Sequence, residues 1–252
     1  MLEVRSPYQV CYCNRHCTGR IQKRNSVIRR MKSMSKDMLE KGAIVQRDKE
    51  TFAIAPHIPG GIIDPAGLRK IADVAEKYNA KALKITSAQR IAIVGIDPQD
   101  IDGAWADLGM SPGAAIGLCV RSVKICPGTT FCKRGQQDSV GVGLKLDEIY
   151  HGMQLPWKFK MGVSGCVNSC AEPAIKDVGL IGTPKGWRLL VGGCGAGKPR
   201  IGQMLAENLS DEEALSLIER VVNYYKDHAK KQRLGEFIEE IGFDKFKQEV
   251  LP

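Results

Sequence analysis

The chain has 252 residues, 43% of them hydrophobic and 26% charged, a composition typical of folded globular proteins and not of disordered ones. Its net charge of +9 favours an acidic partner or an anionic ligand, yet its scattered basic residues match no zinc-finger, homeodomain or RNP pattern of nucleic-acid binding. No apolar stretch approaches the ~18–20 residues that a membrane-spanning helix needs. The N-terminus also lacks the apolar run of a signal peptide, so we expect a cytoplasmic protein that contacts no membrane.

The first 42 residues predict a basic arm that leads into a helix. The arm carries Cys11, Cys13 and Cys17. With His16 these cysteines could bind a metal ion or a second cluster, and the alternative is an arm of free thiols. Residues 26–40 have helical spacing, and Gly42 lies just past the expected end of that helix.

Residues 43–110 predict a small domain in which strands and helices alternate. The expected strands cover 43–47, 51–55, 81–86 and 90–96, and the expected helices cover 64–79 and 97–109. Asp64 is placed to cap the first helix, and Pro65 suits its first position. The order of these elements indicates a small α/β sandwich.

Residues 111–252 predict a second, less regular domain. Its expected strands cover 119–125, 157–163, 177–182 and 187–193, with glycine-rich turns between them. Helices are expected near the C-terminal end, where Ser210 and Glu213 form the pattern of a capping box. The chain is therefore predicted to have an α+β fold, divided into 1–42, 43–110 and 111–252.

Two pairs of cysteines in the second domain indicate a metal centre. Cys126 and Cys132 in "KICPGTTFCKRGQQDS" are separated by five residues, and Cys166 and Cys170 in "GVSGCVNSCAEP" by three. We expect Cys166 and Cys170 to share one face at the start of a helix. Because a reducing compartment disfavours disulfides, clustered cysteines point to metal or redox chemistry. Four thiolates suit a [4Fe–4S] cluster; zinc, which usually binds C-x₂-C pairs, and unliganded thiols are the alternatives.

The pattern C-x₅-C followed by G-C-x₃-C resembles the cluster motif of the sirohaem-dependent sulfite and nitrite reductases. Further blocks extend this resemblance over about residues 43–252: "KITSAQRIAIVGI", "VRSVKICPGTTFCKRGQQDS", "GVSGCVNSCAEPAIKDVGLIG" and "GWRLLVGGCGAGKPR". They are similar to the catalytic region of bacterial assimilatory nitrite reductase large subunits and to small, single-repeat sulfite reductases. The resemblance implies a ferredoxin-like half-domain followed by a mixed α/β domain that binds sirohaem and a [4Fe–4S] cluster.

The resemblance also implies which residues bind these cofactors. The cluster ligands would be Cys126, Cys132, Cys166 and Cys170, and Cys170 would also be the axial thiolate of sirohaem iron. Sirohaem carries eight carboxylates that need cationic or N–H partners. The glycine-rich stretch 192–200 offers such partners in Gly193, Gly195, Lys198 and Arg200, with a simple tight turn as the alternative.

A second implied site binds the anionic substrate. Lys158 and Lys160 alternate along an expected strand and would share one of its sides, although a solvated strand face is the plainer interpretation. The family binds sulfite or nitrite with two such lysines and two arginines, and Arg121 matches one arginine in position. Other members place the second arginine where this chain has Ala88, so Arg90 is the nearest candidate.

These residues predict an oxidoreductase that reduces sulfite to sulfide in six electron steps. Nitrite reduction to ammonia is the alternative within the family, and a non-catalytic iron–sulfur electron-transfer subunit is the alternative outside it. Cationic side chains would bind the oxyanion and protonate each departing oxygen. The chain has no dinucleotide fingerprint and no ferredoxin-type C-x₂-C-x₂-C run, so an acidic ferredoxin, a flavodoxin or a reductase subunit would supply electrons.

The resemblance has a consequence for assembly. Larger family members are two fused copies of this unit, and the anion-binding residues of one copy face the cofactors of the other. A homodimer with sites shared between subunits is therefore expected. Three residues are assigned no part in this chemistry: Cys119 and Cys194 are expected to be structural, and His57 to lie in a loop or at the surface.

Overall fold

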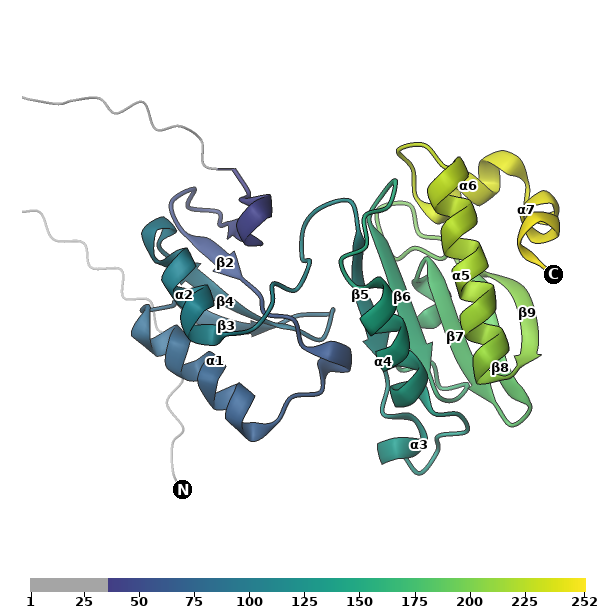
Figure 1. Cartoon of the computed structure of the whole chain (residues 1–252), viewed down its shortest axis with the longest axis horizontal. Coiled ribbons are helices and arrows are strands. Elements are labelled where there is room, and N and C mark those ends of the chain that lie inside the picture. Colours follow the sequence, from purple (N-terminus) through teal and green to yellow (C-terminus); the bar gives the residue numbers. More distant parts are fainter. Residues whose placement is uncertain (1–35) are drawn as a thin grey trace, which may run out of the picture. The chain divides into compact units, whose positions relative to one another are not determined.

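The computed structural model describes residues 36–252 (Figure 1). Cys11, Cys13, Cys17 and most of the helix expected at 26–40 lie outside this range. The described end of that segment is a 3-10 turn, Leu39–Lys41, closed by Gly42 with a left-handed φ of 57°. Within residues 36–252 no helix is long and apolar enough to cross a membrane.

The four strands expected in the first domain form one antiparallel sheet, in the order β1-β2-β4-β3. They are β1 (Ile44–Val45), β2 (Phe52–Ile54), β3 (Ala82–Ile85) and β4 (Ile91–Ile96). β1 and β2 are shorter than expected, and the register of β2 against β4 shifts between Phe52 and Ala53. The central strands β2 and β4 contribute buried apolar side chains to a separate core, whereas the edge strand β3 is exposed at every position.

Two helices pack on this sheet, α1 (Pro65–Lys77) and α2 (Ile101–Leu108). The Asp64 carboxylate accepts the Gly67 N–H at 2.7 Å, which confirms the expected N-cap. Two short 3-10 turns, η2 (Pro59–Gly61) and η3 (Pro98–Asp100), precede the helices. η2 contacts strand β5 and helix α4 of the second domain, so it connects the two sheets.

The second domain contains a mixed sheet in the order β5-β6-β7-β8-β9. Its strands are β5 (Val120–Ile125), β6 (Phe159–Ser164), β7 (Val178–Thr183), β8 (Gly186–Val191) and β9 (Gln203–Leu209). β5, β6 and β7 are parallel, and β8 and β9 continue the sheet antiparallel. The expected α+β class is confirmed, and β9 is an additional strand at the edge.

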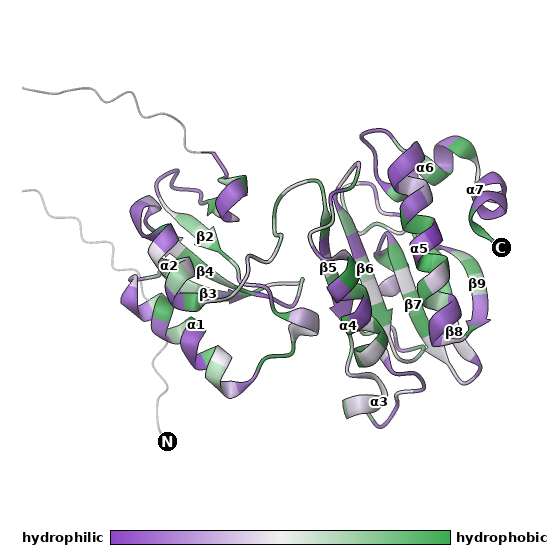
Figure 2. Ribbon diagram, in the orientation of Figure 1, coloured by the Kyte–Doolittle hydropathy of each residue, from purple (hydrophilic) through white to green (hydrophobic). Residues whose placement is uncertain are grey.

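Helices α4 (Ser139–Tyr150) and α5 (Asp211–His228) cover one face of this sheet (Figure 1). Hydrophobic and hydrophilic bands alternate along α5 because only one side of it packs on the core (Figure 2). Its N-terminus carries the expected capping box, since Ser210 Oγ accepts the Glu213 N–H at 3.2 Å and Glu213 Oε2 accepts the Ser210 N–H at 2.8 Å. Three shorter helices complete the domain: α3 (Gly128–Phe131), α6 (Leu234–Ile241) and α7 (Phe243–Val250).

The opposite face of the sheet carries small and polar residues. On β6, Phe159, Met161 and Val163 belong to the core beneath the helices, so alternation turns Lys160 and Gly162 to the other face. The loop after β6 and its turn η4 (Pro173–Ile175) pack over this face. A Cβ on Gly179 would meet the Pro173 carbonyl oxygen at 2.2 Å, so the loop lies directly on the strands.

Candidate functional site

The loops that carry the two cysteine pairs leave the sheet at the same edge, because β5 and β6 are parallel. The Cys126 loop follows β5 and the Cys166 loop follows β6. The N–H groups of Gln136 and Gln137 both donate to the Gly165 carbonyl, at 2.8 and 3.0 Å. The Gly165 N–H in turn donates to Cys126 Sγ at 3.1 Å. The two loops are therefore joined by their backbones.

Glycines allow this close approach. A Cβ on Gly165 would lie 2.6 Å from the Gln137 carbonyl oxygen and 2.8 Å from the Gly128 Cα. A Cβ on Gly182 would lie 2.5 Å from the Gly165 carbonyl oxygen. No other residue type fits these positions without moving backbone, which explains the glycine directly before Cys166 and the glycine that faces it on β7.

Cys166 and Cys170 do not lie on a helix, so that expectation is wrong. The chain turns after β6, and both Ser169 and Glu172 have left-handed φ values, of 54° and 55°. An α-helix cannot contain such residues, and Pro173 then starts a separate 3-10 turn. Cys166 is buried and Cys170 is exposed.

The four cysteines fit a cluster in their chemistry and in the loops that hold them. All four donors are sulfur, and Cys126 Sγ already accepts a backbone N–H of the kind that tunes iron–sulfur ligands. Among residues 36–252, no three His, Cys, Asp or Glu side chains lie close enough to hold a single metal ion. Thiolates that bind the corners of a four-iron cluster lie farther apart than the ligands of one ion.

Two lysines beside the second cysteine pair escaped the sequence analysis. Glu172, two residues after Cys170, contacts Lys176 Nζ at 2.9 Å and Lys124 Nζ at 3.2 Å. The hydrogen bond from Lys176, reinforced by Lys124, lowers the pKa of the Glu172 carboxyl. One carboxylate thus holds two cations, which leaves net positive charge beside the exposed Cys170.

Three of the four predicted anion-binding residues line one cleft of about 190 Å³: Arg90, Arg121 and Lys160. Arg90 is only 6% exposed, and its guanidinium donates to the carbonyl oxygens of Gly113 and Arg121. Arg121 donates from Nε and Nη2 to the Gly117 carbonyl, at 3.0 and 2.9 Å. Burial lowers the pKa of Arg90, but an arginine stays protonated in proteins, so both groups are cations.

Gln89 holds the loop that presents Arg90, although no sequence motif marks it. Its side-chain amide donates to the Ile125 carbonyl and accepts the Ile125 N–H, both at 2.8 Å. Ala88 lines the same cleft as Arg90. The side chain of Arg90 and the position where other family members carry arginine therefore face the same space.

The two lysines of K-x-K are separated by the structure. Lys160 lies on β6 and lines the cleft, whereas Lys158 precedes the strand and is not among the residues that line it. The Lys160 N–H donates to the buried Asp177 carboxylate at 2.8 Å, and Asp177 pairs with Arg233 Nη2 at 2.5 Å. Burial, with the positive charges of Arg233 and Lys176 nearby, lowers the pKa of Lys160.

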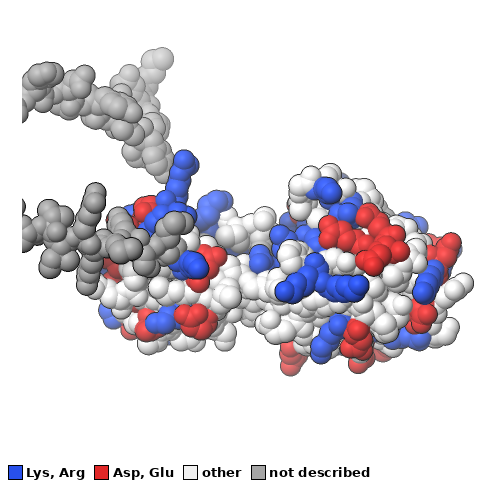
Figure 3. Space-filling view, turned by 90° about the horizontal axis from the view of Figure 1, so that it is seen from above, with Lys and Arg blue, Asp and Glu red and all other residues white. Residues whose placement is uncertain are grey.

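The glycine-rich stretch 192–200 packs against the cysteine loop. A Cβ on Gly193 would lie 2.5 Å from the Ala174 carbonyl oxygen, and one on Gly195 would lie 3.0 Å from the Ile175 side chain. Lys198 is exposed, while Arg200 Nε pairs with Glu239 at 2.6 Å. On the face of the molecule that Figure 3 presents, basic side chains border a group of acidic ones, so positive charge there is not continuous.

A histidine pair lies next to the arginines. His57 lies in a loop, as expected, and its side chain is held there, because its Nε2 lies 2.7 Å from Asp147 Oδ2 and only 19% of the side chain is exposed. Its ring stacks on that of His151 with 3.6 Å between centroids. Cys119 and Cys194 are both buried, and burial raises the pKa of the Cys119 thiol.

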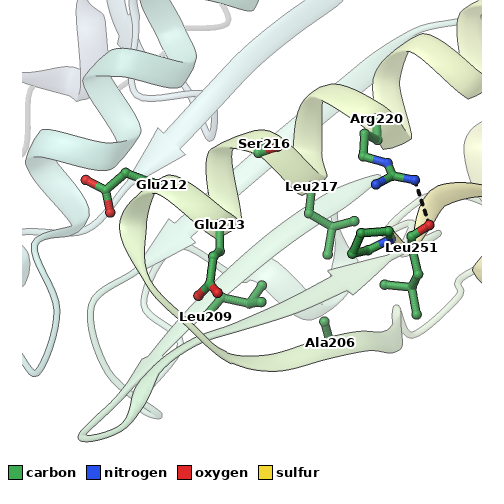
Figure 4. Close-up of a pocket in the computed structure, with 9 residues that line it drawn as sticks. Ala206, Leu209, Glu212, Glu213, Ser216, Leu217, Arg220 and Leu251 are labelled. Atoms are coloured by element: carbon green, nitrogen blue, oxygen red, sulfur yellow. Dashed lines mark hydrogen bonds between the residues drawn. The ribbon is translucent and has the colours of Figure 1, made fainter.

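A larger cavity lies elsewhere in the described part of the chain. It has about 460 Å³ and lies between α5, β9 and the end of the chain, where Arg220 Nη2 donates to the Leu251 carbonyl at 2.6 Å (Figure 4). Ala206, Leu209 and Leu217 give it an apolar wall. None of the predicted site residues lines it.

Comparison with known families identifies the chain. The "Nitrite and sulphite reductase 4Fe-4S domain" family matches residues 116–252, and the "Nitrite/Sulfite reductase ferredoxin-like half domain" family matches residues 44–111. The chain belongs to the nitrite and sulfite reductase 4Fe-4S family. The members of this family are oxidoreductases, which confirms the expected class of protein.

Relatives within the nitrite and sulfite reductase family differ in length. The chain is 45% identical over 212 residues to an assimilatory-type sulfite reductase of Nitratidesulfovibrio vulgaris, an alignment that covers 84% of this chain and 97% of that protein. It is 39% identical over 201 residues to the NAD(P)H nitrite reductase of Bacillus subtilis, across 79% of this chain and 25% of that one. Among solved structures, dissimilatory sulfite reductase I shares the fold with a TM-score of 0.72 at 16% identity, across 79% of this chain and 69% of that one.

Proposed function

We propose that the chain is a sirohaem- and [4Fe–4S]-dependent reductase that converts sulfite to sulfide by the transfer of six electrons. The observation that carries this proposal is the cleft lined by Arg90, Arg121 and Lys160 in a chain whose two cysteine loops are hydrogen-bonded together. The cleft supplies the positive charge that binds an oxyanion, and the cysteine loops supply the thiolates that bind an iron–sulfur cluster. Nitrite reduction to ammonia is the second candidate.

The residues of the cleft have separate parts in this proposal. Arg90 and Arg121 are permanent cations that orient and neutralise the oxyanion. Lys160 is the group that can give up a proton, because its pKa is lowered and an arginine does not deprotonate. Each oxygen that leaves as water takes up two protons, so a renewable donor beside the substrate is required. Lys158, which lies outside the cleft, would act from its rim.

Cys126, Cys132, Cys166 and Cys170 would hold the cluster, with Cys170 as the thiolate shared with sirohaem. Gly193, Gly195, Lys198 and Arg200 would face the carboxylates of the macrocycle, and the pairing of Arg200 with Glu239 makes it the weakest of these candidates. When bound, the two cofactors supply electrons singly to the substrate. The exposed Cys170 suits an anionic cofactor at this position, as does the net positive charge that Lys124 and Lys176 leave after pairing with Glu172.

Sulfite is preferred over nitrite because of the length of the relatives. The assimilatory-type sulfite reductase is matched over 97% of its length, whereas only 25% of the Bacillus subtilis nitrite reductase is covered. The relative built from this single unit is therefore the better guide to the substrate of this chain. Electrons would come from an acidic ferredoxin, a flavodoxin or a reductase subunit, since the sequence has no dinucleotide-binding fingerprint.

The distance along the strands supports a homodimer with shared sites. Cys126 lies five positions after Arg121 along β5, and Cys166 lies six positions after Lys160 along β6 and its loop, which corresponds to roughly 16–20 Å at about 3.3 Å per residue. Arg121 also turns away from Cys126 toward Gly117. Residues this far apart on one chain would serve two different active sites, so one chain would contribute the cysteines of a site and its partner the arginines.

The anaerobic visible spectrum, acid–acetone extraction and turnover with a reduced viologen dye test the proposal. We expect a chlorin-type spectrum with extractable sirohaem, and sulfide formation with a higher kcat/KM than ammonia formation. The reverse order of kcat/KM would assign the protein to nitrite. Bleaching of an iron–sulfur spectrum without consumption of either anion would overturn the enzymatic proposal and favour an electron-transfer subunit.

A further inference from the structure

The histidine pair beside the anion cleft has no part in the proposed reaction. Residues 36–252 contain three histidines, and two of them, His57 and His151, stack on each other at the junction of the two sheets. His57 comes from the loop before η2, and His151 follows α4, one turn after Asp147. Two histidines that come from separate elements and meet beside the arginines of the anion cleft indicate a functional role.

The pair is physically coupled to the arginines. A polar cavity of about 10 Å³, at the lower limit for holding one water molecule, is lined by both histidines, Asp147, Arg90 and Arg121. The backbone of Gly113 favours the protonated form of His151, and the Gly113 carbonyl accepts from the Arg90 guanidinium. A change in the charge of His151 therefore acts on the Gly113 carbonyl, which positions the Arg90 guanidinium.

The charges around the pair define its states. Asp147 is buried and bonds to His57 Nε2, so a proton on His57 has a carboxylate partner. The two rings lie 3.6 Å apart, so charge on one ring opposes charge on the other. Burial, and then the positive charge of His57, lower the pKa of His151, while Asp147 opposes this and Arg90 adds to it. His151 Nε2 is buried without a hydrogen-bond partner in the described part of the chain.

We propose that His57, Asp147 and His151 form a pH-sensitive positioning unit for Arg90, which strengthens anion binding in the cleft when the histidine pair gains a proton. The proton adds positive charge to the cavity that Arg90 and Arg121 line, and a charged His151 competes with Arg90 for the Gly113 carbonyl. Both effects favour binding of an anion to the Arg90 guanidinium, which is then released from the Gly113 carbonyl. The inference rests on the proposed use of Arg90 as an anion-binding residue.

Nitrite binding to the oxidised holoenzyme, without an electron donor, tests this unit directly. Nitrite remains a monoanion between pH 5.5 and 8.5, so the substrate does not titrate in the experiment. We expect nitrite affinity to rise roughly fivefold as the pair is protonated, in the range of typical couplings between sites. Because linkage is reciprocal, saturating nitrite must also raise the pKa of His151, measured by NMR of its ring protons.

Variants separate a pH-sensitive role from a structural one. His57→Gln and His151→Gln should each remove the pH dependence of nitrite affinity, and Asp147→Asn should lower the pKa of His151 further. His228→Asn is the matched control, since His228 is the remaining described histidine and stacks on Tyr224, away from the cleft. It should leave the pH dependence unchanged.

The outcomes distinguish this inference from the proposed function. Nitrite affinity that is independent of pH in the wild-type protein, together with a His151 titration that ignores nitrite, would overturn the inference, whatever the turnover. Turnover of neither anion with a reduced viologen would overturn the function. The wild-type NMR titration needs no variant, so an unstable His151→Gln protein would not prevent the test.

Discussion

Lys160 shows how burial changes the chemistry of one side chain. Its surroundings lower its pKa, so the ammonium is lost at a lower pH than in an exposed lysine. We predict that kcat/KM for nitrite falls as pH rises between 7 and 10. Lys160→Arg should bind the anion but lack this alkaline decline, because arginine stays protonated.

Lys84 provides the control for that measurement. It lies on the exposed strand β3, where its Nζ donates to the Ile85 carbonyl at 2.7 Å. Lys84→Arg should reproduce the wild-type pH profile. If Lys160→Arg shows the same alkaline decline as the wild type, the titrating group is another residue and the assignment of Lys160 as proton donor is wrong.

At the scale of single residues, the sequence predicted site residues that belong to a recognisable motif. It missed site residues whose partners come from distant parts of the chain. Arg90, Arg121 and Lys160 were predicted and share a cleft. Nothing in the sequence pairs His57 with Asp147, because they are 90 residues apart and neither belongs to a repeated spacing. Gln89, whose amide fixes the end of β5, lies inside a predicted block and is a contact that only the fold creates.

At the scale of elements, the junction of the two cysteine loops depends on Gly165. We predict that Gly165→Ala lowers the content of iron and acid-labile sulfide to less than half of the wild-type value. The added Cβ would lie 2.6 Å from the Gln137 carbonyl oxygen, a contact that only a backbone shift relieves, and the same backbone donates to Cys126 Sγ. Iron and sulfide analysis of anaerobically purified protein measures the effect.

Gly197→Ala is the matched control for this prediction. Gly197 lies in the neighbouring glycine-rich stretch, and a Cβ there would have no atom within 4 Å. Its variant should therefore retain wild-type iron and sulfide. Equal cluster content in Gly165→Ala and Gly197→Ala would mean that the close approach of the loops is not required to hold the cluster.

The elements that the sequence missed have identifiable reasons. Helix α4 contains Gly141 and Gly143, which weaken a helical pattern, yet a Cβ on Gly143 would lie 2.6 Å from Ile125 Cγ1, so packing requires this glycine. Strand β9 alternates poorly because it lies at the edge of the sheet and is largely exposed. The expected helix at Cys166 failed because left-handed residues at 169 and 172 bend the chain.

At the scale of the whole molecule, one buried ion pair ties the C-terminal helices to the strand that carries Lys160. Asp177 is fully buried and contacts Arg233 Nη2 at 2.5 Å and the Lys160 N–H at 2.8 Å. We predict that Arg233→Met lowers the free energy of unfolding by about 3–5 kcal/mol, because it leaves a buried carboxylate without its partner. Adding Asp177→Asn should restore part of the loss. Urea denaturation followed by circular dichroism measures both.

Arg188 offers an exposed pair for comparison. Its Nε lies 3.6 Å from Glu207 Oε2, and both side chains are largely exposed, at 43% and 55%. Arg188→Met should cost only about 0–1 kcal/mol, the usual value of a surface ion pair. A loss in Arg233→Met as small as that in Arg188→Met would show that the Asp177 pair does not fasten the helices to the sheet.

The arrangement of the two sites predicts how two defective chains should behave when mixed. Arg121→Ala removes an anion-binding residue and Cys170→Ser removes a cofactor ligand, and each homodimer should be nearly inactive. In a mixed dimer with shared sites, one site combines both defects, while the other combines the intact arginine of one chain with the intact cysteines of its partner. Mixing the two variants under conditions that exchange subunits should therefore restore up to about a quarter of the wild-type activity, since random pairing makes half of the dimers mixed and each has one intact site.

A complete site within each chain makes the opposite prediction. Every chain in the mixture would then carry its own defect, and mixing would restore nothing, however the subunits pair. Subunit exchange must be verified independently, by light scattering for the dimer and by an affinity tag on one variant for the mixed species. Recovery that depends on exchange would place the arginines and the cysteines of one active site on different chains, which the separation along β5 and β6 leads us to expect.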